Sequence, residues 1–75
     1  MDIKILGSGC RNCKVLEENT RKAVNELKLD ATISKVTDFK EIASYNCLRT
    51  PGLVVDGKLV VSGRVPSSED IKQYL

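Results

Sequence analysis

The sequence contains no histidine and no tryptophan, and one phenylalanine and two tyrosines are its only aromatic residues. Without histidine, a cysteine–histidine nucleophile pair and every imidazole-containing zinc site are excluded. So few aromatic side chains give no stacking platform for the bases of a nucleic acid. The net charge is only +2, from scattered basic residues, which gives no electrostatic footprint for nucleic acid either. We therefore expect no nucleic-acid partner.

Long hydrophobic runs are also missing. The longest aliphatic runs, such as Leu53-Val54-Val55, are far shorter than the roughly 20 apolar residues of a membrane-spanning helix. Met1 is followed at once by Asp2 and a strand-like run, without the regions of a signal peptide. We therefore expect a monomeric, cytoplasmic protein without membrane contact. Its single domain, residues 1–75, lies near the lower size limit for folding without a staple or metal.

Three cysteines are present, an odd number that fits a working pair with one extra cysteine better than a structural disulfide framework. Cys10 and Cys13 are three residues apart, between a short apolar run and a long helical pattern. Such a pair forms either a reversible disulfide or a clip for a soft metal. A static disulfide, or two unreactive core cysteines, is the purely structural alternative.

The spacing of apolar residues predicts four strands and three helices. On the polar face of residues 11–27, Glu17 is expected to pair with Arg21. The apolar stripe of the same helix is expected at Cys13, Leu16, Ala23, Val24 and Leu27. The first strand is nearly continuously apolar, as expected for an interior strand, and Lys4 within it is expected to snorkel past an end of the sheet. Asp56-Gly57 predicts a type I′ hairpin. We expect strands at 3–6, 31–36, 52–55 and 58–62, and helices at 11–27, from the N-cap Asp38 to about Asn46, and after the N-cap Ser67.

The predicted order, β-α-β-α-β-β-α, is that of the minimal thioredoxin fold. This α/β fold has a four-stranded mixed sheet flanked by three helices. Its first strand–helix–strand unit implies two parallel strands joined by a right-handed crossover. The third strand is then antiparallel to the first, so that its N-terminal end faces the cysteine segment.

The position of Cys10 and Cys13 at the start of a helix suits disulfide exchange, which needs one exposed thiolate and a second thiol within reach. Unpaired backbone N–H groups and the positive end of the helix dipole lower the pKa of the Cys10 thiol below the value of about 8.5 for an unperturbed cysteine. Arg11 and Lys14 add positive charge beside it. Cys13 lies one turn further along the same face and is more covered. We therefore assign Cys10 as the attacking nucleophile and Cys13 as the resolving thiol.

Thr50-Pro51 precedes the third strand and has two interpretations. A proline at the first residue of a strand is allowed for structural reasons alone. Alternatively the peptide bond is cis, which is nearly confined to X–Pro, and the Thr50 backbone is exposed for pairing with an extended substrate peptide.

Cys47 also has two interpretations. It is either a small buried hydrophobic residue at a helix end, or a regulatory thiol or third soft-metal ligand near Pro51 and Cys10.

Three motifs together resemble a known family: Gly-x-Gly-Cys-x-x-Cys after the first strand, Thr50-Pro51 with Val54-Val55-Asp56-Gly57, and Gly63-Arg64-Val65-Pro66-Ser67. They are similar to the small archaeal and bacterial thioredoxin/glutaredoxin-like redox-active disulfide proteins, over essentially the whole chain. The resemblance implies a thiol–disulfide oxidoreductase with a redox-active Cys10–Cys13 pair and a cis Pro51 facing it. It also implies protein disulfide substrates, a dithiol-donating reductase as a partner, and no cofactor.

The sequence departs from ordinary members of this superfamily. It has neither Trp-Cys-Gly-Pro-Cys nor Cys-Pro-Tyr-Cys, and Ser62-Gly63-Arg64 stands where glutaredoxins use Gly-Gly and Asp for glutathione. The first strand has no acid after Asp2, so the buried carboxylate that assists proton transfer in thioredoxins has no counterpart there.

A soft-metal chaperone that binds Cu(I) through the two cysteines is the alternative function. Such domains usually have a methionine two residues before the first cysteine, where this chain has Ser8. Their element order is β-α-β-β-α-β, which differs from the order predicted here. We therefore favour disulfide exchange and expect no bound metal.

Overall fold

The computed structural model describes residues 1–7, 9 and 11–75. Its elements follow in the predicted order β-α-β-α-β-β-α. They are β1 (Asp2–Leu6), α1 (Arg11–Leu27), β2 (Thr32–Val36), α2 (Phe39–Ser44), β3 (Gly52–Val55), β4 (Lys58–Ser62) and α3 (Ser68–Lys72). Within the described part of the chain, no helix has the length and apolar character needed to cross a membrane.

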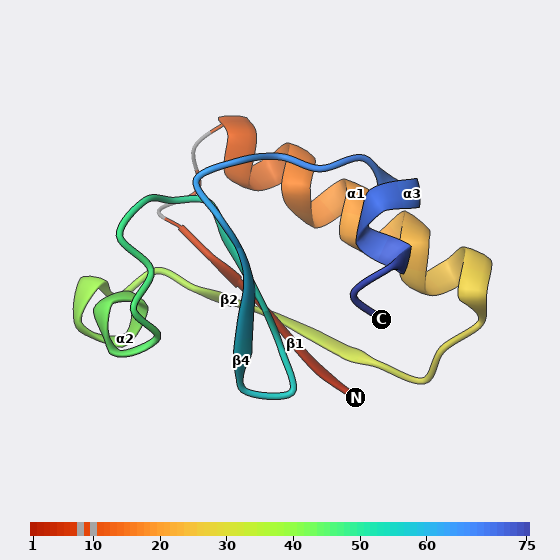
Figure 1. Cartoon of the computed structure of the whole chain (residues 1–75), viewed down its shortest axis with the longest axis horizontal. Helices are drawn as coiled ribbons and strands as arrows, with labels where there is room; N and C mark the ends of the chain where they lie inside the picture. Colours follow the sequence, from red (N-terminus) through yellow and green to blue (C-terminus); the bar gives the residue numbers. More distant parts are fainter. Residues whose placement is uncertain (8, 10) are drawn as a thin grey trace.

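The four strands form one mixed sheet in the order β2-β1-β3-β4. β1 pairs in parallel with β2 and antiparallel with β3, and β3 pairs antiparallel with β4. The interior position of β1 explains why Ile3, Ile5 and Leu6 are all buried. Figure 1 shows α1 and α3 on one face of the sheet and α2 on the other. This arrangement confirms the minimal thioredoxin fold.

Alternate side chains of the strands fill two cores, one on each face of the sheet. The core beneath α1 and α3 contains Ile3, Ile5, Leu16, Ala23, Val24, Leu53, Val55, Val61 and Ile71. The core beneath α2 contains Leu6, Val36, Ile42, Cys47 and Val54. Since helices cover both faces, the ends of the strands and their loops are left to build a functional site.

The buried face of α1 differs from the predicted apolar stripe at two positions. Leu27, expected on that stripe, is 41% exposed, whereas the polar Thr20 is fully buried. Thr20 Oγ1 donates a hydrogen bond to Leu16 O at 2.7 Å, so the buried hydroxyl is satisfied inside the helix. Leu27 is the last residue of α1, and the chain leaves the helix at Lys28, which has a φ of 54°.

The predicted caps and turns are confirmed. Asp38 and Ser67 are the N-caps of α2 and α3, and each side chain accepts a hydrogen bond from a backbone N–H of the first helical turn. Asn46, just beyond α2, has a φ of 62°. The hairpin residues Asp56 and Gly57 have φ values of 50° and 83°, as a type I′ turn requires.

The prediction that the Lys4 side chain leaves β1 past an end of the sheet is wrong. Lys4 Nζ donates a hydrogen bond to the hydroxyl of Tyr45, the C-cap of α2, at 2.9 Å and lies 5.6 Å from the centre of that ring. The hydrogen bond to Tyr45 raises the pKa of Lys4 above its ordinary value. The lysine is therefore accommodated by a partner on α2 and not by solvent at a strand end.

Candidate functional site

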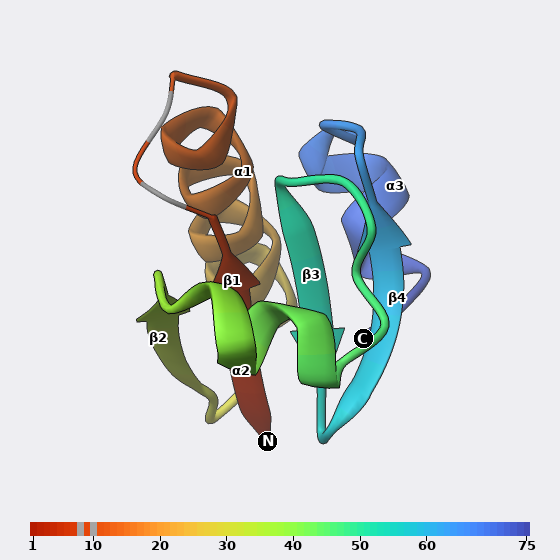
Figure 2. The same ribbon diagram turned by 90° about the vertical axis from the view of Figure 1, so that its left-hand side faces the viewer.

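Three segments that are distant in sequence meet at one end of the sheet. They are the first turn of α1, the loop before β3 and the segment after β4, which all lie at the upper end of the molecule in Figure 2. Gly7 N donates to Val36 O at 2.9 Å, and Gly63 N donates to Pro51 O at 2.8 Å. The pairing of Leu6 with Gly52 places Gly7 and Thr50-Pro51 at the same end of the sheet, as the predicted topology requires.

Gly7 is the point of contact between the two motifs. A Cβ built on Gly7 would overlap the sulfur of Cys13 and would lie 3.9 Å from Thr50 Cβ. Only glycine leaves room for the cysteine at this position, because a real Cβ never approaches a neighbour so closely. Cys13 and Thr50 therefore border the same short piece of backbone.

The first turn of α1 carries the expected charges around the cysteine pair. Cys10 lies outside the described residues, and α1 begins at the next residue, Arg11. Arg11 and Lys14 are exposed, and the first turn contains no acidic residue. Cys13 is buried on the inner side of the same turn. A thiolate at the start of this helix would face two cations and the positive end of the helix dipole.

The Thr50–Pro51 peptide bond is cis. Thr50 is exposed and Pro51 is buried. The carbonyl of Arg49, just before this pair, accepts hydrogen bonds from Cys47 Sγ at 3.0 Å and from Ser62 Oγ at 3.2 Å. The loop that presents Thr50 is therefore held from both sides, by the chain after α2 and by the end of β4.

Cys47 is buried in the core beneath α2. Its sulfur fits against Gly52, where a Cβ would approach it to 2.7 Å. It thus packs as a small buried side chain and also lies beside the cis-proline loop. Among the described residues, no group of three or more histidine, cysteine or acidic side chains is arranged to hold a metal ion.

A pocket of about 50 Å³ opens beside Cys13, with room for water. Its charged side chains come from two elements: Lys14 and Glu17 from α1, and Lys35 from β2. Its remaining lining residues are Ile5, Gly7, Gly9, Cys13 and Thr37.

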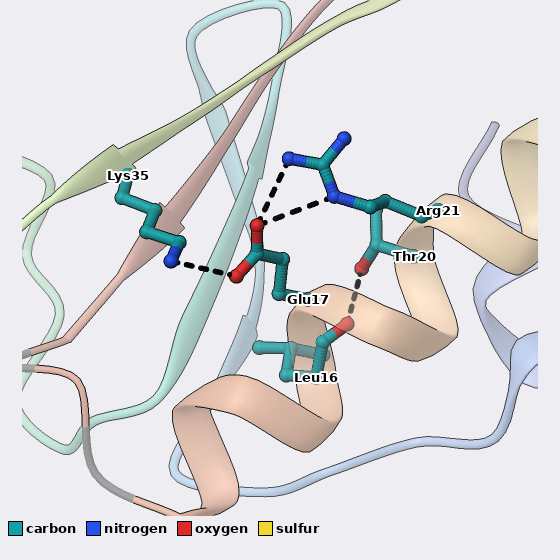
Figure 3. A network of polar contacts seen from close by, with 5 residues as sticks. All are labelled: Leu16, Glu17, Thr20, Arg21 and Lys35. Carbon is teal, nitrogen blue, oxygen red and sulfur yellow. Dashed lines mark hydrogen bonds and ion pairs between the residues drawn. The ribbon is translucent and has the colours of Figure 1, made fainter.

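Glu17 is the centre of a polar network in this pocket, shown in Figure 3. Its Oε1 pairs with Lys35 Nζ at 3.0 Å, and its Oε2 pairs with Arg21 Nη2 at 2.9 Å. The side chain of Glu17 is only 14% exposed. The hydrogen bonds from Lys35 and then from Arg21 lower the pKa of this carboxyl below its ordinary value. Glu17 is therefore an ionised carboxylate at neutral pH, one helical turn beyond Cys13.

The sequence interpretation missed this acid beside the cysteine pair. It considered Glu17 only as a surface partner of Arg21 and looked for a carboxylate in the first strand. The spacing of four residues from Cys13 to Glu17 was the available signal, because it places both on one helix face. Lys35 had no such signal, since its position follows from its pairing opposite Ile5 in the parallel strands.

The family model of the thioredoxin domain matches residues 1–75. The chain belongs to the thioredoxin domain family. The thioredoxin of Methanothermobacter thermautotrophicus is 47% identical over 75 residues, which cover all of this chain and 97% of that protein. The thioredoxin of Methanocaldococcus jannaschii is 48% identical over 73 residues, covering 97% of this chain and 84% of that one. The resemblance inferred from the motifs is thus confirmed.

Membership in this family makes the protein a thiol–disulfide oxidoreductase. The family also indicates protein substrates and a reductase as partners. The alternative of a soft-metal chaperone receives no support, and the element order differs from the one expected of it.

Proposed function

We propose that the protein exchanges disulfides with protein substrates through Cys10 and Cys13, with Cys10 as the attacking nucleophile and Cys13 as the resolving thiol. The proposal rests on the placement of Cys13 Sγ and Thr50 Cβ around the space that a Cβ of Gly7 would occupy. This placement supports a buried resolving thiol directly behind the surface on which a substrate backbone would lie. The exposed Thr50 backbone, before the buried Pro51, is the segment that we propose pairs with an extended substrate peptide.

The proposed reaction has two exchange steps. The Cys10 thiolate attacks one sulfur of the substrate disulfide, the second substrate sulfur leaves as a thiolate, and a mixed disulfide forms. The Cys13 thiolate then attacks the sulfur of Cys10 and releases the remaining substrate thiolate. The substrate gains two electrons, the protein retains a Cys10–Cys13 disulfide, and a dithiol-donating reductase restores the dithiol.

Arg11 and Lys14 are the residues that we propose tune the first step. Both are exposed cations in the first turn of α1, without an acid in that turn. Positive charge and unpaired helix N–H groups favour the thiolate and so lower the pKa of Cys10. A pair that is oxidised and reduced in turn also fits a reducing compartment, where disulfides are transient and catalytic, and we therefore propose a cytoplasmic location. We also propose that the protein acts as a monomer.

Single-turnover kinetics test the roles of the two cysteines. The prereduced protein is mixed with a peptide disulfide, and the released thiols are followed with time. Cys10→Ser should abolish the reaction, whereas Cys13→Ser should accumulate a mixed disulfide that mass spectrometry detects. Cys47→Ser is the matched control and should react like the unmodified protein. Peptide reduction that persists in Cys10→Ser would refute the assignment.

The reduction potential of the pair, measured beside a metal titration, separates exchange from metal binding. We expect a potential between about −270 and −200 mV, the range from thioredoxin to glutaredoxins. Tight binding of Cu(I) by the reduced protein, together with no exchange activity, would favour the metal-chaperone alternative instead.

A further inference from the structure

Four exposed cations border the end of the molecule that carries Cys13 and Thr50. Arg11 and Lys14 project from the first turn of α1, and Arg49 directly precedes Thr50. Arg64 follows Gly63, just beyond β4. We call these four residues, together with Leu48, the cationic rim.

Close contacts join the Arg49 and Arg64 parts of the cationic rim. Gly63 N bonds to Pro51 O at 2.8 Å, and a Cβ at Gly63 would lie 2.8 Å from Arg49 Cβ and 3.2 Å from Arg49 Cδ. The stem of Arg49 therefore lies along Gly63. Arg64 Nη2 donates to the Tyr74 hydroxyl at 2.8 Å, which fixes this second guanidinium on the side of α3. In Figure 2 the loop before β3 and the segment after β4 reach the same upper end of the molecule as the first turn of α1, on the side of α3.

Among the described residues, no ion pair joins any of the four cations of the cationic rim to an acid. Glu17 is already bridged by two further cations, Arg21 and Lys35. Asp38 accepts a hydrogen bond from the backbone N–H of Lys40 at the start of α2. The four positive charges of the cationic rim can therefore pair with carboxylates of another protein.

Leu48 adds an apolar contact to the cationic rim. It is 94% exposed, the most exposed large hydrophobic side chain among the described residues, and it adjoins Arg49. Its neighbour Cys47 is buried and bonded to Arg49 O, so the backbone that carries Leu48 is anchored. A leucine held clear of the core in this way has its apolar surface available to a partner.

We propose that the cationic rim docks protein partners whose disulfide is flanked by acidic residues, with Leu48 covered by an apolar side chain of the same partner. The inference rests on the proposed function, because it selects among disulfides that approach Cys10 and Thr50. Opposite charges at the border of a binding surface accelerate encounter and disfavour partners of like charge. The partner is therefore a protein with carboxylates beside its cysteines.

Two peptides of equal length, each with one intramolecular disulfide, test the proposal. Glutamates flank the cysteines in one and lysines in the other, and the second-order rate constant with prereduced protein is measured for both. The glutamate peptide should react about five- to tenfold faster at low salt, and the difference should shrink as salt is added. Arg49→Glu and Arg64→Glu should each reduce or invert this preference.

Lys58→Glu is the matched charge control, since Lys58 lies exposed at the start of β4, beside the hairpin and away from the cationic rim. It changes the net charge equally and should keep the preference for the glutamate peptide. An equal loss in Lys58→Glu and Arg49→Glu would overturn the proposal, because only the total charge would then matter. When each peptide also carries a leucine beside its disulfide, Leu48→Ser should slow both, and an unchanged rate would remove Leu48 from the surface.

A small neutral disulfide, 2-hydroxyethyl disulfide, separates failure of this inference from failure of the proposed function. If the protein reduces neither this compound nor either peptide, the proposed function is wrong. If it reduces the compound and reacts equally with both peptides at low salt, the exchange chemistry stands and the docking proposal is overturned.

Discussion

The sulfur of Cys13 occupies the space that Gly7 leaves open by having no side chain. Gly7→Ala would force the sulfur or the backbone of the β1–α1 segment to move. We expect the variant to lose about 1–3 kcal/mol of unfolding free energy, as overpacking in a filled core does. Its exchange rate should also fall, because the resolving thiol is displaced. Urea unfolding and single-turnover kinetics with a peptide disulfide measure the two effects.

Gly57→Ala is the control for this substitution. Gly57 has a φ of 83° and open space around the position of a Cβ, so alanine meets backbone strain but no contact. It should cost about 1 kcal/mol of stability and leave the exchange rate unchanged. Wild-type stability and rate in Gly7→Ala would show that the close packing of glycine and cysteine is not required.

Cys47 offers a test of the third cysteine. Serine retains a donor for Arg49 O but is smaller and more polar in the core beneath α2. We expect Cys47→Ser to lose about 1 kcal/mol of stability while exchange stays largely intact. Thermal unfolding and the single-turnover rate are the measurements. A loss of rate as large as that of Cys10→Ser would place Cys47 in the reaction.

The packing of Cys47 against Gly52 predicts energetic coupling between these two residues. Gly52→Ala would bring a Cβ to 2.7 Å from Cys47 Sγ, with Leu6 Cδ1 and Val61 O at 3.3 Å. The single substitution should destabilise by about 1–3 kcal/mol. In a double-mutant cycle, Cys47→Ala should relieve part of this cost, so that the double variant is more stable than the sum of the single effects predicts. Strict additivity would mean that Leu6 and Val61, not the thiol, determine the cost.

Much of the fold was predictable because its signals are local. The hairpin follows from Asp56-Gly57, whose residues tolerate positive φ, and the starts of α2 and α3 follow from Asp38 and Ser67, whose side chains accept hydrogen bonds from the first turn. The cis Thr50–Pro51 bond matches one of two open interpretations, which the sequence could not separate.

Two of the errors concern partners that are distant along the chain. Lys4 is retained inside the sheet by Tyr45, 41 residues away, and no short pattern encodes that meeting. The burial of Thr20 on α1 was not predicted, because a hydroxyl counts as polar in a hydrophobic pattern. Here the hydroxyl is hydrogen-bonded to Leu16 O within the same helix, so it can be buried. In the candidate site, the burial of Cys13 was predictable but the pocket beside it was not, since Lys35 reaches Glu17 only through strand register.

The Glu17 network predicts a specific dependence of stability on pH. The pKa of Glu17 is lowered in the folded protein by hydrogen bonds from Lys35 and Arg21, so the unfolded chain binds the proton more readily. The stabilisation is therefore fully present above the unfolded pKa of about 4.3 and is lost as the pH falls through the folded value. Glu17→Gln should cost about 0.5–1 kcal/mol at neutral pH and nothing at a pH below the folded value.

Urea unfolding at a series of pH values measures this difference. Glu18→Gln is the matched control, because Glu18 is the next residue of α1, is exposed, and has no ion pair within the part of the chain that the structure describes. Its effect should be small at every pH. If the two variants lose the same stability at neutral pH, or if the cost of Glu17→Gln persists in acid, the ion pairs of Glu17 do not stabilise the pocket beside Cys13.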